Sequence, residues 1–329
     1  MSNLRLRLKS WQLPAAVFLF VLVILSAVQL TVDPPMLILE RFIEGGGWFE
    51  ILGVSFYAGF LAKMMQDTAN SGRWRRISWT LFSVVFFSQL ILGVSGLERF
   101  LMTGELHLPV PAMIISGPVY RAEISFMTIL FLSTVILTGP AWCSHFCYFG
   151  GLDNHLAAGK PRAKSFRNQF KIRHSLLMIF IVVTLLLRLL NVSSLHATLL
   201  GLAAGVAGLL VMVLLTYPSG KMAHCTLFCP VGTVVMYLKR LNPFRIYIHS
   251  NCTLCMSCAP HCKYDALHPE SIRKGRPDAS CTYCGDCLSS CHKGSIRYGF
   301  PGLSNHQARK LYLFLTVSIH AIFMALARI

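Results

Sequence analysis

The stretch CTLCMSCAPHC at residues 252–262 and its second copy, CTYCGDCLSSC at residues 281–291, decide the fold of the region around them. Each copy holds four cysteines, separated by two, two and then three residues. Eight of the twelve cysteines of the chain fall in this repeated pattern. Because the same gaps recur in the same order, the pattern indicates one kind of site that is built twice.

This spacing is typical of cubane [4Fe–4S] clusters, in which each iron takes one thiolate and short steps place three sulfurs around one face of the cube. In two-cluster ferredoxins the fourth cysteine of each run binds the other cluster. Zinc sites usually stop at paired C-x2-C steps, and disulfides do not explain the recurring gaps. The pattern therefore predicts two clusters. The expected ligand sets are Cys252, Cys255 and Cys258 with Cys291, and Cys281, Cys284 and Cys287 with Cys262.

The two runs resemble bacterial ferredoxins, with one departure. The proline that commonly follows the fourth cysteine is replaced by Lys263 in one run and by His292 in the other. The resemblance implies a small α+β two-cluster domain over residues 248–300. A small residue and an aliphatic one still follow each run, as Ala266-Leu267 and Ser295-Ile296.

The rest of the chain has the composition of a membrane protein. It is 54% hydrophobic and 13% charged, roughly half the charged fraction usual in soluble domains. About 20 apolar helical residues cross the hydrocarbon layer of a bilayer. We therefore predict a multi-span α-helical membrane protein with about seven transmembrane helices. The expected spans lie near residues 12–32, 45–65, 77–97, 122–141, 174–192, 196–216 and 309–327, and a cleaved signal peptide is the alternative for the first.

These spans divide the chain into three expected domains. Residues 1–247 form a transmembrane domain, residues 248–300 the ferredoxin-like domain, and residues 301–329 a final transmembrane helix. Lys and Arg gather in alternate loops, which the positive-inside rule assigns to the cytoplasm together with the ferredoxin-like domain. Much of the formal charge of +17 is then flanking charge that faces an anionic leaflet, so we expect no nucleic-acid partner. The expected location is the bacterial inner (cytoplasmic) membrane, with the chain crossing it several times.

The other four cysteines form a second internal repeat. Residues 143–150 (CSHFCYFG) and 225–232 (CTLFCPVG) share the pattern C-x2-F-C-x2-G, and each follows the cytoplasmic end of an expected span. If a helix continues through the motif, its two thiols lie on one face. Three interpretations stay open: a further metal or iron–sulfur centre, two dithiol/disulfide couples, or buried structural thiols. The cysteines concerned are Cys143, Cys147, Cys225 and Cys229, flanked by His145 and His224.

With its spans, paired C-x3-C motifs and carboxy-terminal ferredoxin runs, the chain resembles the polyferredoxin-type membrane subunits of bacterial respiration. Examples are the quinol-dehydrogenase subunits of periplasmic nitrate reductase systems (NapH type), the membrane electron donors of nitrous oxide reductase (NosR type) and the methylamine-utilisation ferredoxins (MauN type). The resemblance covers residues 122–300 and implies electron transfer linked to the quinone pool. Tyr148 stands where the family often has proline.

The segment between the third and fourth expected spans is a candidate quinone site. Quinol oxidation needs a base near an apolar slot, and His107 or Glu123 could serve, although an ordinary amphiphilic loop is the alternative. Intramembrane haem is a weaker possibility, since His320, His174 and His196 form no evident pair at matching depth. The sequence has no Rossmann or phosphate-binding fingerprint in the required strand–helix context.

Two functions therefore remain. The first is a membrane-bound iron–sulfur electron-transfer subunit of a quinone-linked oxidoreductase complex, exchanging electrons between the quinone/quinol pool or a partner redox subunit and cytoplasmic clusters. The second is a membrane reductase or assembly factor, which uses cytoplasmic electrons to reduce a metal ion such as copper, or a disulfide, during maturation of another metalloenzyme. A membrane redox sensor is a third class, but the chain shows no recognisable output domain.

Overall fold

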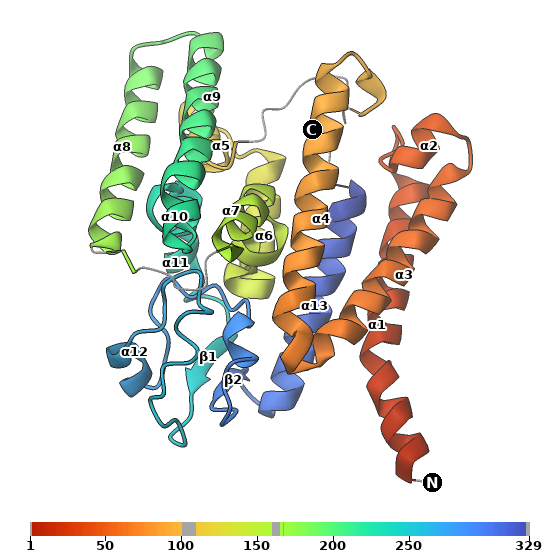
Figure 1. The fold of residues 1–329 in the computed structure, drawn as a ribbon. Helices are drawn as coiled ribbons and strands as arrows, with labels where there is room; N and C mark the ends of the chain where they lie inside the picture. The colour runs from red at the N-terminus through yellow and green to blue at the C-terminus, as the bar shows by residue number, and fades with distance from the viewer. Residues whose placement is uncertain (1, 101–109, 160–164, 167, 327–329) are drawn as a thin grey trace. The chain divides into compact units, whose positions relative to one another are not determined.

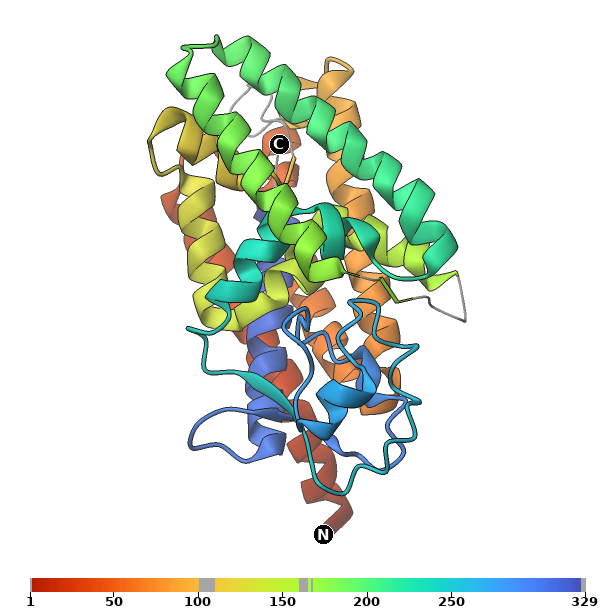
Figure 2. The same cartoon turned by 90° about the vertical axis from the view of Figure 1, so that its left-hand side faces the viewer.

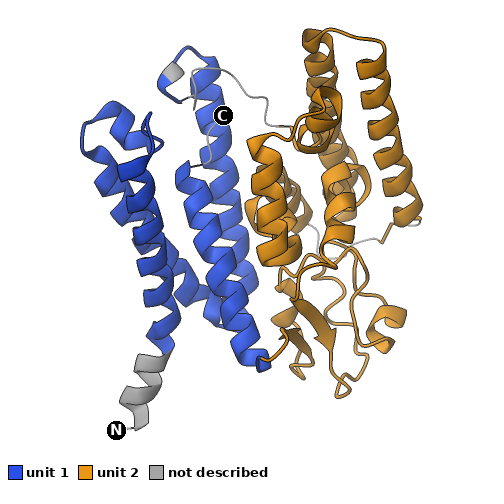
Figure 3. Ribbon diagram, turned by 180° about the vertical axis from the view of Figure 1, so that it is seen from behind, with its two compact units in different colours: residues 1–107, 303–329 blue, residues 108–302 orange. Residues whose placement is uncertain are grey.

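The computed structural model describes residues 2–100, 110–159, 165–166 and 168–326, with side chains except those of residues 2–9 and 98. The described chain is mostly helical and divides into two compact units (Figure 3). Unit 1 consists of residues 1–107 and 303–329, and unit 2 of residues 108–302. Unit 2 holds all twelve cysteines.

Unit 1 is built from long helices (Figure 1). Helix α1 buries every fourth residue along one side, because positions four apart lie on the same face of a helix. These residues, from Leu13 to Leu25, pack in one core with α3 and α13. Leu19 and Val23 of the same helix are more than half exposed, as expected of an apolar helix that faces lipid. The helices are α1 (Ser2–Thr31), α2 (Ile38–Phe42), α3 (Gly46–Gln66), α4 (Thr68–Val94) and α13 (Asn305–Leu326), with a 3-10 turn at Glu98–Phe100.

Six helices of the described chain are long and apolar enough to cross a membrane, judged by length and composition. They match six of the seven expected spans and indicate a membrane protein. The seventh, expected at residues 45–65, is present as the 21-residue α3 but is not among the six. It contains Glu50 and Lys63, and the count of seven stays a prediction. The six are Ser10–Thr31, Thr68–Val94, Phe126–Phe146, Gln169–Leu189, Ser194–Ser219 and Asn305–Leu326.

The described part of unit 2 contains eight α-helices of different lengths, together with short 3-10 and π-helical turns (Figures 1 and 2). Ser125 caps α6 by accepting a hydrogen bond from the Thr128 amide at 3.3 Å, and the chain reverses between α8 and α9 at Asn191, whose φ is 50°. Its α-helices are α5 (Met113–Arg121), α6 (Phe126–Thr138), α7 (Tyr148–Ala158), α8 (Gln169–Leu189), α9 (Ser194–Val211), α10 (Tyr217–Ser219), α11 (Pro230–Leu238) and α12 (Pro269–Arg273). The 3-10 turns are Gly139–Ala141 and Asp286–Leu288, and the π-helical turns are Trp142–Phe146, Met212–Thr216 and His224–Phe228.

A two-stranded antiparallel sheet closes the ferredoxin-like segment of unit 2. Strands β1 (Arg245–Ile248) and β2 (Ile296–Gly299) pair with Ile248 opposite Ile296, and both of these isoleucines are buried. The loops between the strands lie at one end of the unit's helices (Figures 1 and 2). The strands therefore bring the two cysteine runs together.

The compact units group the chain differently from the three expected domains. Residues 108–247 and the ferredoxin-like segment form one unit, whereas the final helix belongs with residues 1–107. The expected domain boundaries at residues 247/248 and 300/301 do not coincide with the boundaries of the compact units, and they stay predictions.

Candidate iron–sulfur sites

Two cavities in the ferredoxin-like segment are each lined by four cysteines. In both, three cysteines come from one run and the fourth comes from the other, which is the crossed arrangement that the spacing predicts. The first cavity is lined by Cys252, Cys255, Cys258 and Cys291. The second cavity is lined by Cys262, Cys281, Cys284 and Cys287. Isoleucines contribute to both walls, Ile248, Ile272 and Ile296 to the first and Ile246 and Ile296 to the second.

The backbone follows the same unusual path around the second cysteine of each run. Leu254 and Met256 have φ of 57° and 58° on either side of it in the first run, and Tyr283 and Gly285 have φ of 58° and 80° in the second. Left-handed backbone costs a residue with a side chain roughly 1–2 kcal/mol. Alternation of backbone handedness forms concave nests of N–H groups, which bind anions and occur at iron–sulfur sites. Both loops therefore fit an anionic cluster.

The fourth cysteine of each run also has the same hydrogen bond. The Cys262 sulfur accepts from the Ala266 amide at 3.3 Å, and the Cys291 sulfur accepts from the Ser295 amide at 3.2 Å. Donation of an N–H to the charged form of a thiol stabilises the thiolate. The small residues that follow each run are fully buried beside these sulfurs.

The C-x3-C motifs are not continuous α-helix, so the expectation of two thiols on one helical face is wrong. The first cysteine of each motif lies in a π-helical turn, at residues 142–146 and 224–228. The second, Cys147 or Cys229, is extended, and its amide donates to the carbonyl five residues earlier at 3.0 or 2.8 Å. Single π turns are frequent at functional sites. The wider turn separates the two cysteines and starts a new helix after the second.

That new helix places its first turn beside the second thiol of each motif. Cys147 is the N-cap of α7 and Cys229 is the N-cap of α11. The amides that follow each cysteine oppose the rise in the pKa of its thiol that burial causes. First-turn amides lack partners inside a helix and form the positive end of its dipole. A Cβ at Gly232 would lie 2.7 Å from the Cys225 carbonyl oxygen, which explains the glycine at that position.

The four thiols of the two motifs come within electrostatic reach of one another. Burial raises the pKa of Cys147 to about 12, and the nearby Cys229 raises it further. Burial also raises the pKa of Cys225 well above its usual value, with further increases from Asp153, Cys229, Cys147 and Cys143. Cys143 of the first motif and Cys225 of the second also line one common cavity, so the two motifs lie close together in unit 2.

All twelve cysteines are described and none forms a disulfide. Among the described residues, no three His, Cys, Asp or Glu side chains are placed to bind a single metal ion. In a cubane cluster each cysteine binds a different iron, so its ligands need not meet at one ion. An iron–sulfur centre, buried structural thiols and the reduced form of two dithiol couples are all compatible with this geometry, so the three interpretations of the C-x3-C motifs stay open.

Two buried cations face the C-x3-C thiols. Arg173 and Lys239 are 3% and 8% exposed, and they line one cavity with Cys143, Cys225 and Cys281. The Arg173 Nε donates to Thr233 Oγ1 at 3.2 Å. Buried charge is costly without a compensating partner. The cavity therefore favours an anionic occupant.

Sequence reasoning counted both cations as basic residues that flank the spans, and it missed the buried Asp153. One oxygen of Asp153 accepts from Thr216 Oγ1 at 2.6 Å and the other from the Cys225 amide at 3.0 Å. Burial raises the pKa of this carboxyl to about 6. Asp153 thus orients the first cysteine of the second motif.

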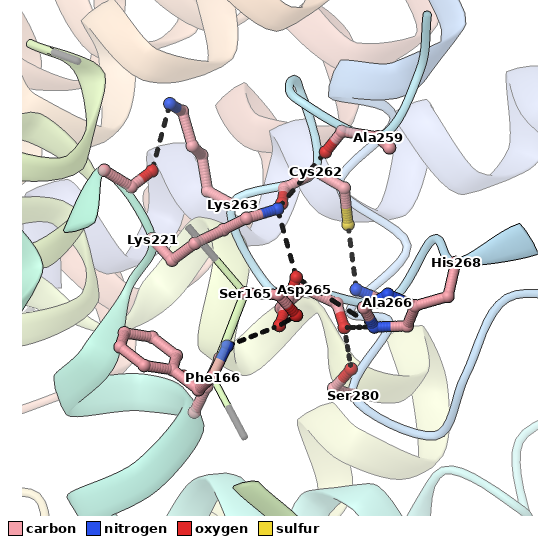
Figure 4. A network of polar contacts seen from close by, with 12 residues as sticks. Ser165, Phe166, Lys221, Ala259, Cys262, Lys263, Asp265, Ala266, His268 and Ser280 are labelled. Carbon is pink, nitrogen blue, oxygen red and sulfur yellow. Dashed lines mark hydrogen bonds and ion pairs between the residues drawn. The ribbon is translucent and has the colours of Figure 1, made fainter. Parts of the chain in front are cut away.

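A network of buried polar contacts holds the second cavity against the helical part of unit 2 (Figure 4). Lys221 Nζ lies 3.2 Å from Asp265 Oδ1 and donates to the Cys262 carbonyl at 2.6 Å. The other oxygen of Asp265 accepts from the Ser165 hydroxyl and from the Phe166 amide. The charged side chains of Lys221 and Asp265 are 5% and 3% exposed. The loop that carries Cys262 is therefore fixed on both sides.

The residue that replaces the usual ferredoxin proline belongs to this contact. Lys263 Nζ donates to the Gly220 carbonyl at 3.1 Å, and the Lys263 carbonyl accepts from the Met222 amide at 3.0 Å. The next residue, Tyr264, donates its hydroxyl to the Cys143 carbonyl. Lys263 thus helps to hold the ferredoxin-like segment against the helical part of unit 2. Its neighbour Tyr264 contacts the first C-x3-C motif.

The candidate quinone and haem residues are not brought together. His107 lies outside the described residues, and Glu123 is exposed between α5 and α6. His320 is buried in unit 1, where its Nε2 is 3.1 Å from the Tyr57 hydroxyl. His174 is hydrogen-bonded to Tyr237, and His196 to Ser193. Neither the quinone site nor haem gains support from these contacts.

These features define a helical protein with apolar helices of membrane-spanning length and iron–sulfur sites. A family model described as a 4Fe-4S binding domain matches residues 122–164 and 202–246. The matched segments contain the two C-x3-C motifs and end before Cys252. The match supports iron–sulfur clusters, two of which fit its two segments, and an iron–sulfur electron-transfer role.

The chain is also similar to an uncharacterized protein of Methanocaldococcus jannaschii. The two are 26% identical over 234 residues, which cover 68% of this chain and 85% of the relative. No solved structure matches the chain.

Proposed function

We propose that the protein is a membrane-bound electron-transfer subunit, which exchanges electrons between the quinone pool or a partner redox subunit and [4Fe–4S] clusters in its ferredoxin-like segment. One observation carries the proposal: Cys281 of the second cavity and Cys143 and Cys225 of the C-x3-C motifs line one common cavity. One cysteine of a four-cysteine site thus lies beside the motifs at the ends of the apolar helices. Such proximity is what electron exchange between a peripheral segment and the membrane requires.

In this proposal each cysteine set holds one group. Cys252, Cys255, Cys258 and Cys291 hold the first cluster, and Cys281, Cys284, Cys287 and Cys262 hold the second. Bound there, a [4Fe–4S] cluster supplies reversible one-electron transfer. The paired N–H···S bonds and the left-handed loops stabilise the charge of the thiolates.

Cys143, Cys147, Cys225 and Cys229 hold a further iron–sulfur centre. Two of these thiols lie at the N-terminal ends of α7 and α11, where the first-turn amides favour the thiolate form. Arg173 and Lys239 offset the negative charge that four thiolates bring into a buried site. The family match across both motifs supports this assignment. Oxidation of a quinol releases two electrons and two protons, so it needs two one-electron acceptors. The proposed clusters are numerous enough to accept both electrons.

Redox titration of the full chain in native membranes tests the function. Addition of a quinol analogue should generate the EPR signal of reduced cubane clusters within the mixing time of a freeze-quench experiment, and a quinone-site inhibitor should block its appearance. Clusters that quinol leaves oxidised, but that a low-potential donor reduces, would contradict a quinone-linked role.

The further centre has its own test. Iron analysis of the purified full chain should show three clusters rather than two, and the double substitution C143A/C229A should remove one cluster while both ferredoxin-type signals remain. C258S serves as the control that removes a ferredoxin-type cluster instead. Unchanged iron content in the double variant would leave the four C-x3-C cysteines as structural thiols.

A second function, reduction of a metal ion such as copper or of a disulfide for maturation of another metalloenzyme, draws support from the four C-x3-C cysteines, none of which forms a disulfide. In that case electrons run from a cytoplasmic donor towards the C-x3-C thiols. Copper(II) added to membranes would then oxidise reduced clusters rapidly in the wild type and slowly in C143A/C229A. Equal rates in the two proteins would count against this function.

A further inference from the structure

The two ferredoxin-type cavities differ in their access to solvent. Cys255 of the first cavity is exposed, and its neighbour Leu254 is 39% exposed. Cys262 of the second cavity is buried, and Lys221 holds its loop against the helical part of the unit. A molecule in solution can therefore approach the first cavity more closely than the second.

Basic side chains adjoin the lining of the first cavity from two directions. Ile272 lines the cavity and the exposed Arg273 follows it at the end of α12. Cys291 also lines it, and the exposed Lys293 lies two residues further on, in a turn closed by the Gly294 amide and the Cys291 carbonyl at 2.9 Å. The Lys293 carbonyl accepts from the Asn251 side chain at 3.2 Å, next to Cys252.

A third basic residue follows a backbone contact with the lining of the same cavity. Gly275 accepts at its carbonyl from the amide of Ile248, another lining residue, at 2.7 Å, and the exposed Arg276 follows Gly275. Within the part of the chain that the structure describes, Arg273, Arg276 and Lys293 form no ion pair. Their charge is therefore free to act on an approaching molecule.

Acidic residues do not balance this charge. Residues 248–262, which hold most of the first ligand run, contain no Asp or Glu. Of the acidic residues in 248–300, Asp265 is paired with Lys221 and Asp286 is 4% exposed. Glu270 is exposed and Asp278 is partly exposed, but the exposed basic residues Arg273, Lys274, Arg276 and Lys293 outnumber them. The accessible edge of the first cavity is thus a basic surface around an exposed leucine.

We propose that this surface, made of residues 249–258 with Arg273, Arg276 and Lys293, is the docking site of a soluble, acidic one-electron carrier protein. The inference rests on the proposed function, since it states where a redox partner meets the chain. Complementary charge steers such encounters and raises association rates. Weak electron-transfer complexes use small interfaces, and an apolar centre with a polar rim is their usual anatomy.

Binding of a purified acidic [2Fe–2S] ferredoxin to the full chain in nanodiscs of neutral lipid tests the proposal. The EPR spectrum of the [2Fe–2S] ferredoxin differs from that of cubane clusters, so binding of the probe and integrity of the chain's own clusters can be followed together. The triple variant R273E/R276E/K293E should lower the association rate constant by about tenfold or more at low salt. The single variant K293E should show part of this loss, and salt should weaken wild-type binding.

R73E is the matched control, because Arg73 is an exposed arginine of α4 in unit 1 and the reversal changes the charge by the same amount. It should bind the probe as the wild type does. Equal losses in R73E and K293E, or binding that ignores salt, would overturn the proposal. So would a triple variant that keeps ferredoxin binding but no longer binds vesicles of anionic lipid, since the basic surface would then contact the membrane.

Quinol-dependent cluster reduction, measured on the same samples, separates this inference from the proposed function. The triple variant should keep its wild-type iron content and its reduction by quinol. A wild type that binds the ferredoxin probe but is not reduced by quinol would remove the quinone link and leave the docking site standing. Normal cluster reduction by quinol without any binding of the ferredoxin probe would remove the docking site and leave the quinone link standing.

Discussion

The two ferredoxin-type cavities have the same cysteine spacing and the same backbone path, but they have opposite surroundings. The first cavity carries the exposed Cys255, whereas the second contains the buried Cys262 and touches the C-x3-C motifs through Tyr264 and Cys281. Ligand geometry is a local property of each run, since the spacing places the sulfurs. Access and electrostatic environment instead depend on which residues from elsewhere pack against the run. Identical motifs can therefore have different roles in one protein.

The largest expected effect separates two cysteines of one run. C258S should abolish the cluster of the first cavity, and C262S the cluster of the second, because the fourth cysteine of a run crosses to the other site. Iron content and EPR of the full chain measure the loss. Hydrogen exchange at the Met222 amide, which is bonded to the Lys263 carbonyl, should speed up in C262S alone. Loss of the same cluster in both variants would show that the sets are not crossed.

The next effect concerns the buried ion pair of Lys221 and Asp265. Removal of one partner leaves a buried charge uncompensated, which costs about 3–5 kcal/mol. K221M should therefore lower the opening free energy of the surrounding amides in native-state hydrogen exchange. K293M removes an exposed lysine next to the first cavity and should change stability by less than about 0.5 kcal/mol. Equal effects of the two substitutions would mean that the Lys221–Asp265 pair does not hold the second cavity against the helical part of unit 2.

A smaller effect distinguishes the two residues that stand where ferredoxins have proline. K263A removes a charged hydrogen bond to the Gly220 carbonyl, which should cost about 1.5–3 kcal/mol. H292A at the equivalent exposed position of the other run should fall within about 0.5 kcal/mol of the wild type. Chemical denaturation followed by the loss of cluster absorbance compares them. A destabilised H292A with an unaffected K263A would reverse the assignment of the docked run.

The smallest effect is on redox potential. Lys239 Nζ donates to the Ala279 and Cys281 carbonyls at 2.6 and 2.8 Å, so its charge favours the more negative, reduced state of a cluster in the second cavity. K239M should lower that midpoint potential by on the order of 60 mV, a tenfold change in a one-electron equilibrium. R240M, at the exposed neighbouring position, is the control. A change in midpoint potential confined to the cluster of the first cavity would contradict the placement of Lys239 beside the second cavity.

The cysteine sets of the two cavities were predictable because a C-x2-C-x2-C-x3-C run leaves little choice about which sulfurs can meet. The path of the C-x3-C motifs was not. A spacing of four residues is compatible with a continuous helix, and only packing among α6, α8, α9 and α11 shows that the turns widen at residues 142–146 and 224–228. Helix propensity does not record such tertiary preferences.

The cations near the thiols were misjudged for a related reason. In the sequence, Arg173 and Lys239 are basic residues at the ends of apolar stretches, which is also the pattern of charge that flanks a membrane span. In the folded chain both are buried. Lys263 seemed a simple departure from the ferredoxin pattern, and its role emerged only when its partner, Gly220, was placed beside it.

The sequence by itself determined the apolar spans and the repeated cysteine motifs, and it predicts the crossed sets of the two ferredoxin-type sites, because these depend on hydropathy and on the short reach of a few residues. The tertiary structure alone decided which cavity is buried, which is accessible, and which cations lie against the thiols. Those properties come from contacts between residues far apart in the chain, such as Lys221 with Asp265 and Tyr264 with Cys143. Spacing within a motif carries no information about the segment that will pack against it.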